Sequence, residues 1–244
     1  MQTPSSFPFF RSVKAEMEER FIFNFRVRPD DLAKKLTAPW LKPQVVNGWC
    51  AVSFCILRLS KLSVVPIPPI IPFSTISCAY RIGVIDTSSS KPEPSVYVTE
   101  RWADLPLAAK LAPWILLDSV PVIEASLTRR DGGTDIAFRY FDRTPLFQAA
   151  VFPAPSFQSQ VFESIEAFAA FIKGGVSSYA PSLYGGAFTK VTLLKEDAEY
   201  SPMMATIRYS ELHRLWDDVE MELDSAVRAT GAAYKWTYEG LVSA

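Results

Sequence analysis

Histidine and cysteine are scarce in this sequence of 244 residues, which contains one histidine and three cysteines. Nucleophilic serines and cysteines usually need a histidine as their base, and His213 lies in a polar stretch where we expect a surface residue. Cys50, Cys55 and Cys78 are odd in number and form no C-x-x-C pair, which argues against a disulfide framework. Each lies in an apolar, strand-like stretch, so we expect buried free thiols. Structural zinc usually needs four clustered nitrogen or sulfur ligands, so we expect no metal site.

An excess of charge, a membrane-spanning segment and nucleotide-binding motifs are also missing. Lysine and arginine number 25 against 26 aspartate and glutamate residues, so we expect neither nucleic acid nor a membrane as a partner. The most hydrophobic stretch, residues 62–73, is short and rich in proline, whereas a bilayer-spanning helix needs about 20 apolar residues. The sequence contains no G-x-G-x-x-G, G-x-x-x-x-G-K-[ST] or G-x-S-x-G motif, and we expect no cofactor. No signal segment is visible, so the expected location is the cytoplasm.

Strand patterns dominate what is present. Arg20–Arg28 and residues 74–85 alternate between apolar and polar side chains, and Trp49–Leu59 is almost continuously apolar. Asp131-Gly132-Gly133 between two strand-like runs is a hairpin signal. Strands joined by hairpins and interrupted by a few helices favour an α+β, mostly antiparallel β fold over alternating βαβ units. We expect one domain over residues 1–244, with residues 1–17 as an extended lead segment.

Four segments have helix signals. Pro29-Asp30-Asp31 opens a short helix, because aspartate accepts hydrogen bonds from free backbone amides at a helix start. Residues 104–117 have Asp104 near the cap and Pro106 in the first turn, and Pro113 is expected to end or kink that helix. Residues 164–173 have a capping residue, an apolar stripe and two glycines after it. Residues 211–228 carry leucine, valine and tryptophan at helical spacing, which predicts a long helix packed on the core.

The order of these elements resembles the acetoacetate-decarboxylase-like superfamily, in which a strand, a short acidic helix and a second long strand open the domain. An uncharacterised bacterial branch of it, a domain of unknown function, is more similar. Its P-Y-x-R-A-x-M pattern resembles residues 121–127 (PVIEASL), and its G-S-L-E-x-F-L pattern resembles residues 164–168 (SIEAF). The likeness runs from about residue 18 to residue 225. It implies a cone-like antiparallel β-barrel, capped by peripheral helices, with a pocket inside.

The resemblance also shows where this chain departs from the family. In acetoacetate decarboxylases a lysine after a proline forms a Schiff base with the substrate, but here Leu107 follows Pro106. Lys110 is the nearest amine and is our catalytic candidate, because its apolar neighbours would lower its pKa. The alternative is a lysine that extends from the helix to water. The arginine of the uncharacterised branch is Glu124 here, and its R-Y pair is replaced by residues 172–173.

Several other side chains are candidates for binding a ligand inside the barrel. A charged residue among apolar strand neighbours needs a partner or a wet cavity, and a guanidinium or carboxylate there would orient a carbonyl or carboxylate ligand. The alternative for each is a salt bridge at the mouth of the barrel or a place on a solvent-facing strand. The candidates are Arg81, Glu100, Arg101, Glu124 and Tyr97.

We therefore expect an acetoacetate-decarboxylase-like protein that binds a small organic carbonyl or carboxylate ligand, as a lyase-type enzyme without the standard Schiff-base lysine. A non-catalytic ligand-binding or sensing module is the alternative, and a pocket filled by Trp49, Trp102 and Trp114 would favour it. A third possibility is an oligomeric structural protein that docks a second subunit through the apolar residues 64–73.

Overall fold

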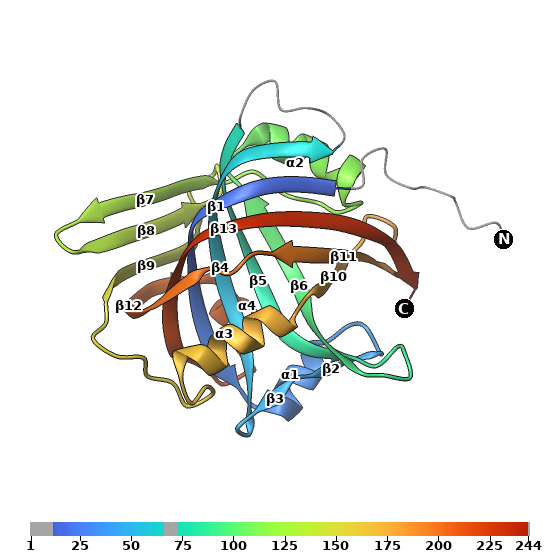
Figure 1. The fold of residues 1–244 in the computed structure, drawn as a ribbon, viewed down its shortest axis with the longest axis horizontal. Helices are drawn as coiled ribbons and strands as arrows, with labels where there is room; N and C mark the ends of the chain where they lie inside the picture. Colours follow the sequence, from blue (N-terminus) through green and yellow to red (C-terminus); the bar gives the residue numbers. More distant parts are fainter. Residues whose placement is uncertain (1–11, 66–72, 244) are drawn as a thin grey trace.

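The computed structural model describes residues 12–65 and 73–243, and Figure 1 shows that strands make up most of the molecule. Thirteen strands form a single sheet. In chain order they are β1 (Ser12–Val27), β2 (Leu41–Pro43), β3 (Val45–Val46), β4 (Trp49–Val65), β5 (Phe73–Asp86), β6 (Glu93–Ala103), β7 (Glu124–Arg130), β8 (Gly133–Arg139), β9 (Pro145–Pro153), β10 (Ser177–Pro181), β11 (Ala187–Lys195), β12 (Glu199–Ser210) and β13 (Met221–Ser243).

Seven of these strands close into a ring. The order β1-β4-β5-β6-β10-β11-β13 returns on itself because β13 also pairs with β1. The sheet continues from β13 through β12, β9, β8 and β7, which form an open extension beside the ring (Figure 1). All pairings between these strands are antiparallel except β6 with β10. The mostly antiparallel β class is confirmed, but the sheet is mixed and partly open, so it is not a clean barrel.

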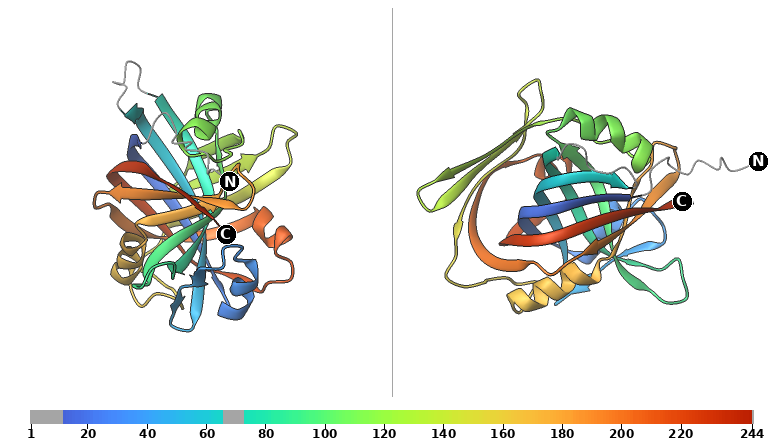
Figure 2. Two further views of the ribbon diagram at one scale, coloured as in Figure 1. Left: turned by 90° about the vertical axis from the view of Figure 1, so that its right-hand side faces the viewer. Right: turned by 45° about the horizontal axis from the view of Figure 1, so that its top comes forward.

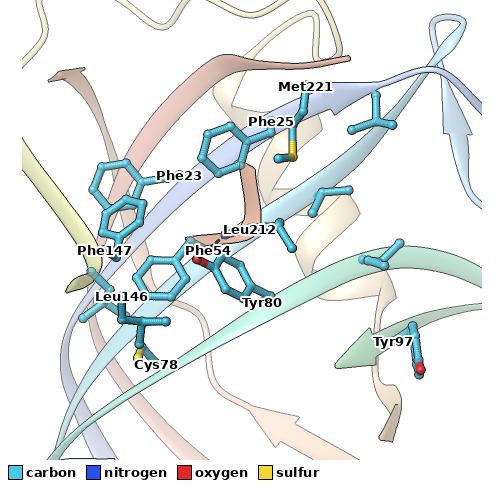
Figure 3. Close-up of a cluster of buried hydrophobic side chains, with 14 of the residues drawn as sticks. Phe23, Phe25, Phe54, Cys78, Tyr80, Tyr97, Leu146, Phe147, Leu212 and Met221 are labelled. Atoms are coloured by element: carbon cyan, nitrogen blue, oxygen red, sulfur yellow. Dashed lines mark hydrogen bonds between the residues drawn. The ribbon is translucent and has the colours of Figure 1, made fainter. Parts of the chain in front are cut away.

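The two faces of the ring strands serve different purposes. Phe23 in β1 and Phe54 in β4 turn outward and pack on Phe147 of the extension, with ring centroids 4.9 and 4.2 Å apart (Figure 3). Burying a phenylalanine side chain stabilises a fold by roughly 1.5–3 kcal/mol, so this aromatic cluster holds the extension against the ring. Successive residues of a strand point to opposite faces, and the neighbours Ile22 and Cys55 therefore belong to the inner face.

Short helices cover the ends of the ring. They are α1 (Pro29–Lys35), α2 (Pro106–Ile115), α3 (Ile165–Gly174) and α4 (Glu211–Leu215). In the right-hand view of Figure 2, α2 lies above the ring strands and α3 below them. Ser164 begins α3 because its hydroxyl accepts a hydrogen bond from the Ala167 amide at 3.2 Å. The first three predicted helices are confirmed, with small shifts of their ends.

The predicted long helix over residues 211–228 is wrong. Only α4, five residues long, is helical there, and β13 begins at Met221. Pairing with β1 along β13 outweighs the local pattern, because tertiary contacts override propensity. Asp224 has no partner in the register between β1 and β13, so the two faces of β13 exchange at this residue. Leu223 therefore packs in the aromatic core, which contains Phe54 and Phe147, whereas Val227 packs in the cluster under α3, which contains Phe162 and Phe168.

The structure also bears on the predictions for the cysteines, the N-terminal lead segment and membrane-spanning helices. Cys50, Cys55 and Cys78 are free and buried, as predicted. Residues 12–17 of the predicted lead are part of β1, while residues 1–11 lie outside the described residues, as do residues 66–72 of the proline-rich run. In the described part of the chain no helix has the length and apolar character that crossing a membrane requires.

Candidate functional site

The inner face of the ring encloses a cavity of about 220 Å³. Strands β4, β5 and β6 supply one wall, β11 and β13 the other, and residues of α2 and of the C-terminal end of α3 complete it. Tight packing is normal in protein interiors and voids larger than a water molecule are few. A space of this size inside the ring is therefore the first candidate for a binding site.

Two arginines lie on the cavity wall on either side of Cys55, Arg20 buried and Arg81 half-buried. Arg20 in β1 is opposite Leu57 of β4, and Arg81 in β5 is opposite Ser53 of the same strand. Cys55 lies between Ser53 and Leu57 on that face, so both guanidiniums are its diagonal neighbours. Nη2 of Arg20 donates a hydrogen bond to Sγ of Cys55 at 3.3 Å.

A local irregularity in β1 turns Arg20 inward. The register between β1 and β4 shifts between Met17 and Glu19. Up to Met17 the odd-numbered residues of β1 face inward, and after the shift the even-numbered residues do. Met17 packs on the cavity side with Leu57, whereas Glu19 points away and forms ion pairs with Arg129 and Arg228. Arg20 is therefore the next inner residue, and its side chain is 3% exposed.

Lys195, the last residue of β11, adds an amine to the same wall. Its Nζ donates a hydrogen bond to the backbone oxygen of Ile172 near the end of α3. Burial lowers the pKa of Lys195 to about 7, and the positive charges of Arg20 and Arg81 act in the same direction. Burial also lowers the pKa of Arg81, with contributions from the Arg20 and Arg101 guanidiniums against an opposing one from Cys55. The three cations are thus close enough to repel one another.

Against the effect of burial, Cys55 raises the pKa of Arg20 through its charge and its hydrogen bond, but no carboxylate within the described ranges balances this group. Arg101 also lines the cavity, but Asp118 neutralises it through an ion pair of 2.9 Å. Among residues 12–65 and 73–243, no carboxylate pairs with Arg20, Arg81 or Lys195. The Nε atoms of both arginines are buried without a hydrogen-bond partner. A buried charge is costly unless it is paired, so this arrangement suits an anionic ligand.

The predicted site residues are divided between different parts of the molecule. Arg81 and Arg101 line the cavity. Glu100, next to Arg101, is exposed and lines a separate groove outside the ring. Partial desolvation of its carboxylate in this groove raises the pKa of Glu100, and the nearby carboxylate of Glu211 adds to the effect.

Three other candidates do not reach the cavity wall described above. Tyr97 is buried in the aromatic core, where its hydroxyl lies 2.7 Å from the hydroxyl of Thr37. Glu124 is exposed at the start of β7. Lys110 is exposed on α2, whose opposite face contributes Ala108 and Ala112 to the wall.

The tryptophans that would have filled the pocket lie elsewhere. Trp102 belongs to the aromatic core and Trp49 packs with the cluster under α3. Trp114 is 67% exposed. The wall instead contains Trp236 of β13, and the cavity between these elements stays open.

Sequence reasoning missed Arg20 and Lys195. Both carried a signal: Arg20 begins the polar face of an alternating strand, and Lys195 follows Val191 and Leu193 with a period of two. The same argument selected Arg81. The local pattern does not contain the closure of the ring, which brings the middle of β1 and the end of β11 to one cavity.

Known structures share this architecture over more than nine-tenths of their own length. An acetoacetate decarboxylase from Legionella pneumophila covers 100% of this chain and 92% of its own, with a TM-score of 0.63 and 13% identity. The chain has the acetoacetate-decarboxylase fold. The predicted resemblance is confirmed at that level.

Two further structures with this fold have other descriptions. The enduracididine biosynthesis enzyme MppR, complexed with pyruvate, covers 100% of this chain and 91% of its own, with a TM-score of 0.59 and 13% identity. An acetoacetate decarboxylase-like enzyme from Sphingomonas wittichii covers 100% and 97%, with a TM-score of 0.57 and 12% identity. No protein-family profile matches the sequence, and no curated protein matches it.

Proposed function

We propose that this chain binds a small oxo acid in the ring cavity and acts on its carbonyl group as a lyase-type enzyme. Arg20 and Arg81 hold the carboxylate, and Lys195 supplies the amine. The observation that carries the proposal is the presence of an amine and two guanidiniums with buried Nε atoms on one cavity wall, with no described carboxylate to pair them.

The guanidinium charges of Arg20 and Arg81 support the binding of the ligand's carboxylate. Guanidinium groups bind carboxylates through paired hydrogen bonds, which are stronger than those between neutral groups. Within the described residues the Arg20 side chain has one hydrogen-bond partner, the sulfur of Cys55, which leaves other N–H groups for a ligand. A carboxylate placed between Arg20 and Arg81 would offset the repulsion among the two guanidiniums and the ammonium form of Lys195.

The amine end follows from the pKa of about 7 that burial gives Lys195. A neutral amine adds to a carbonyl carbon, the carbonyl oxygen leaves as water, and the resulting iminium carries the positive charge. The iminium then accepts the electron pair released when a bond to the neighbouring carbon breaks. Lys195 takes this role in place of the lysine that Leu107 replaces.

The two arginines favour chemistry that keeps the carboxylate. Decarboxylation turns the carboxylate into neutral CO₂, so groups that stabilise the anion bind the substrate better than the transition state. Breaking a C–H or C–C bond beside an iminium leaves the carboxylate charged throughout. We therefore propose a 2-oxo acid rather than a 3-oxo acid as the reacting ligand. MppR, which shares the fold, is described in complex with pyruvate.

Reductive trapping tests the amine. Sodium cyanoborohydride with pyruvate should attach one pyruvate-derived group to Lys195, found by mass spectrometry of its peptide. Lys195→Met should abolish this adduct, whereas Lys110→Met, a matched change on the exposed face of α2, should leave it intact. An adduct at Lys110 in the wild-type protein, with none at Lys195, would refute this assignment and restore the candidate chosen from the sequence.

Proton exchange separates catalysis from binding. In D₂O the enamine formed from a Lys195 iminium should exchange the methyl protons of pyruvate, and NMR should show the exchange in wild type and not in Lys195→Met. Binding of pyruvate without exchange or adduct would favour the non-catalytic ligand-binding module. Release of CO₂ from acetoacetate at a rate above proton exchange would overturn the preference for a retained carboxylate.

A further inference from the structure

The cavity has a charged end and an apolar end. Lys195 lies near the C-terminal end of α3, where its Nζ contacts the oxygen of Ile172, and Arg20 and Arg81 flank Cys55 on the same wall. Beyond Leu57, which is opposite Arg20, the inner face of β4 continues to apolar residues from Leu59 onward. Thr75 and Ser77 of β5 lie beside them, and both hydroxyls donate hydrogen bonds to protein oxygens. At about 3.3 Å per residue, the Cα atom of Leu59 lies about 13 Å along the strand from that of Cys55.

Helix α2 closes the apolar end. The residues that it contributes are Ala108, Leu111, Ala112 and Ile115, which follow the i, i+3, i+4, i+7 spacing of one helix face. Its other face carries the exposed Lys110. The helix therefore presents only alkyl groups to the cavity. Small alanines alternate with larger side chains there, which leaves room between the helix and the strands.

The size of the space indicates how much ligand it holds. A cavity of about 150 Å³ holds benzene, which has six heavy atoms, so each atom needs about 25 Å³. The cavity of about 220 Å³ then accommodates about nine heavy atoms by the same ratio. Pyruvate has six, and three of its atoms are oxygens that belong at the charged end. It would leave the alkyl-lined end unfilled.

We infer that the natural ligand is a 2-oxo acid with an unbranched apolar tail of about four carbons, whose tail lies against α2 while its carboxylate lies between Arg20 and Arg81. This inference rests on the proposed function and adds the substrate class to it. The tail gains free energy from leaving water, at about 0.8 kcal/mol per methylene, which is about fourfold in affinity for each.

A chain-length series tests the tail. Dissociation constants of pyruvate, 2-oxobutanoate, 2-oxohexanoate and 2-oxodecanoate, measured by isothermal titration calorimetry on the full chain, should fall about fourfold per methylene up to 2-oxohexanoate. The longest acid should bind more weakly than this trend predicts. Hexanoate, which has no oxo group, should also bind more tightly than butanoate, both in wild type and in Lys195→Met.

Filling the apolar end provides a matched pair of variants. Ala108→Leu, on the face of α2 that lines the cavity, should weaken 2-oxohexanoate at least tenfold and leave pyruvate unchanged. Ala109→Leu, one residue away on the same helix and absent from the cavity wall, should change neither. Ala112→Leu is the second filling variant if Ala108→Leu does not fold.

The outcomes separate the two proposals. Pyruvate adducts at Lys195 combined with affinities that do not rise with chain length would overturn the inference about the tail and leave the proposed function standing. The absence of adducts together with no binding of any carboxylate would overturn both. A rise in affinity with chain length that Ala108→Leu does not reverse would show that the tail binds elsewhere and refute its placement under α2.

Discussion

The reactivity of Lys195 depends on the charges around it, and Arg20→Met is the change that measures this dependence. Burial is the main cause of the lowered pKa, and the Arg20 and Arg81 guanidiniums contribute further. Removing one positive charge favours the protonated amine, so the pKa of Lys195 should rise in Arg20→Met. Methionine keeps an unbranched apolar side chain in place of the arginine stem, which limits the loss of packing.

The size of the effect follows from the fraction of neutral amine. With a pKa of about 7, half of the Lys195 side chains are neutral at pH 7. A lysine with the ordinary value of about 10.4 is neutral in roughly one molecule in 2,500, so Lys195 should be about a thousandfold richer in reactive amine. If Arg20→Met raises the pKa by one unit, the neutral fraction at pH 7 falls about fivefold. Each further unit lowers the neutral fraction by nearly tenfold.

Trace acetylation measures this without any substrate. Small amounts of acetic anhydride at pH 5 to 11, followed by mass spectrometry of the Lys195 peptide, should give a titration with its midpoint near pH 7 in wild type. The midpoint should move upward in Arg20→Met and, independently, in Arg81→Met. Lys110→Met serves as the control and should leave the curve unchanged.

Two results would refute the reasoning. A wild-type midpoint at pH 9 or above would show that the cavity does not disfavour the ammonium form. An unchanged midpoint in both arginine variants, with folding confirmed by circular dichroism, would show that the guanidiniums do not act on the amine.

Three other perturbations have predictable results. Gly83→Ala places a Cβ 2.5 Å from the Phe171 ring, so it should lower the free energy of unfolding by about 1–3 kcal/mol in urea titrations, and Phe171→Leu should recover part of the loss. Ser164→Ala removes the cap bond to Ala167 and should cost about 1 kcal/mol in the same assay, while Ser164→Asp should cost less. The pKa of Lys195 is lowered in the folded state, so protonation of its amine favours unfolding. Lys195→Met removes this amine and should have a higher free energy of unfolding than wild type. The difference should be largest below pH 7 and shrink as the pH rises towards 10.5. A gain that is constant from pH 6 to 10 would contradict this sign.

The sequence by itself determined the local elements and the faces of its strands. The alternation after Arg20 separates the phenylalanines that form the aromatic core from the polar face, and the Ser164 cap fixes the start of α3. These features depend on a side chain and its near neighbours, so a local pattern contains them. Arg81 was recognised for the same reason, as a charge among apolar residues of one strand.

Only the tertiary structure decided what those faces enclose. The pairing of β13 with β1 closes the ring, replaces a helix predicted over residues 211–228 and brings Lys195 beside Arg20. Lys110 and Lys195 both have apolar neighbours in the sequence, yet one is exposed and the other lines the cavity. Burial and repulsion between charges depend on distances through space, and contacts between strands far apart in the chain set those distances.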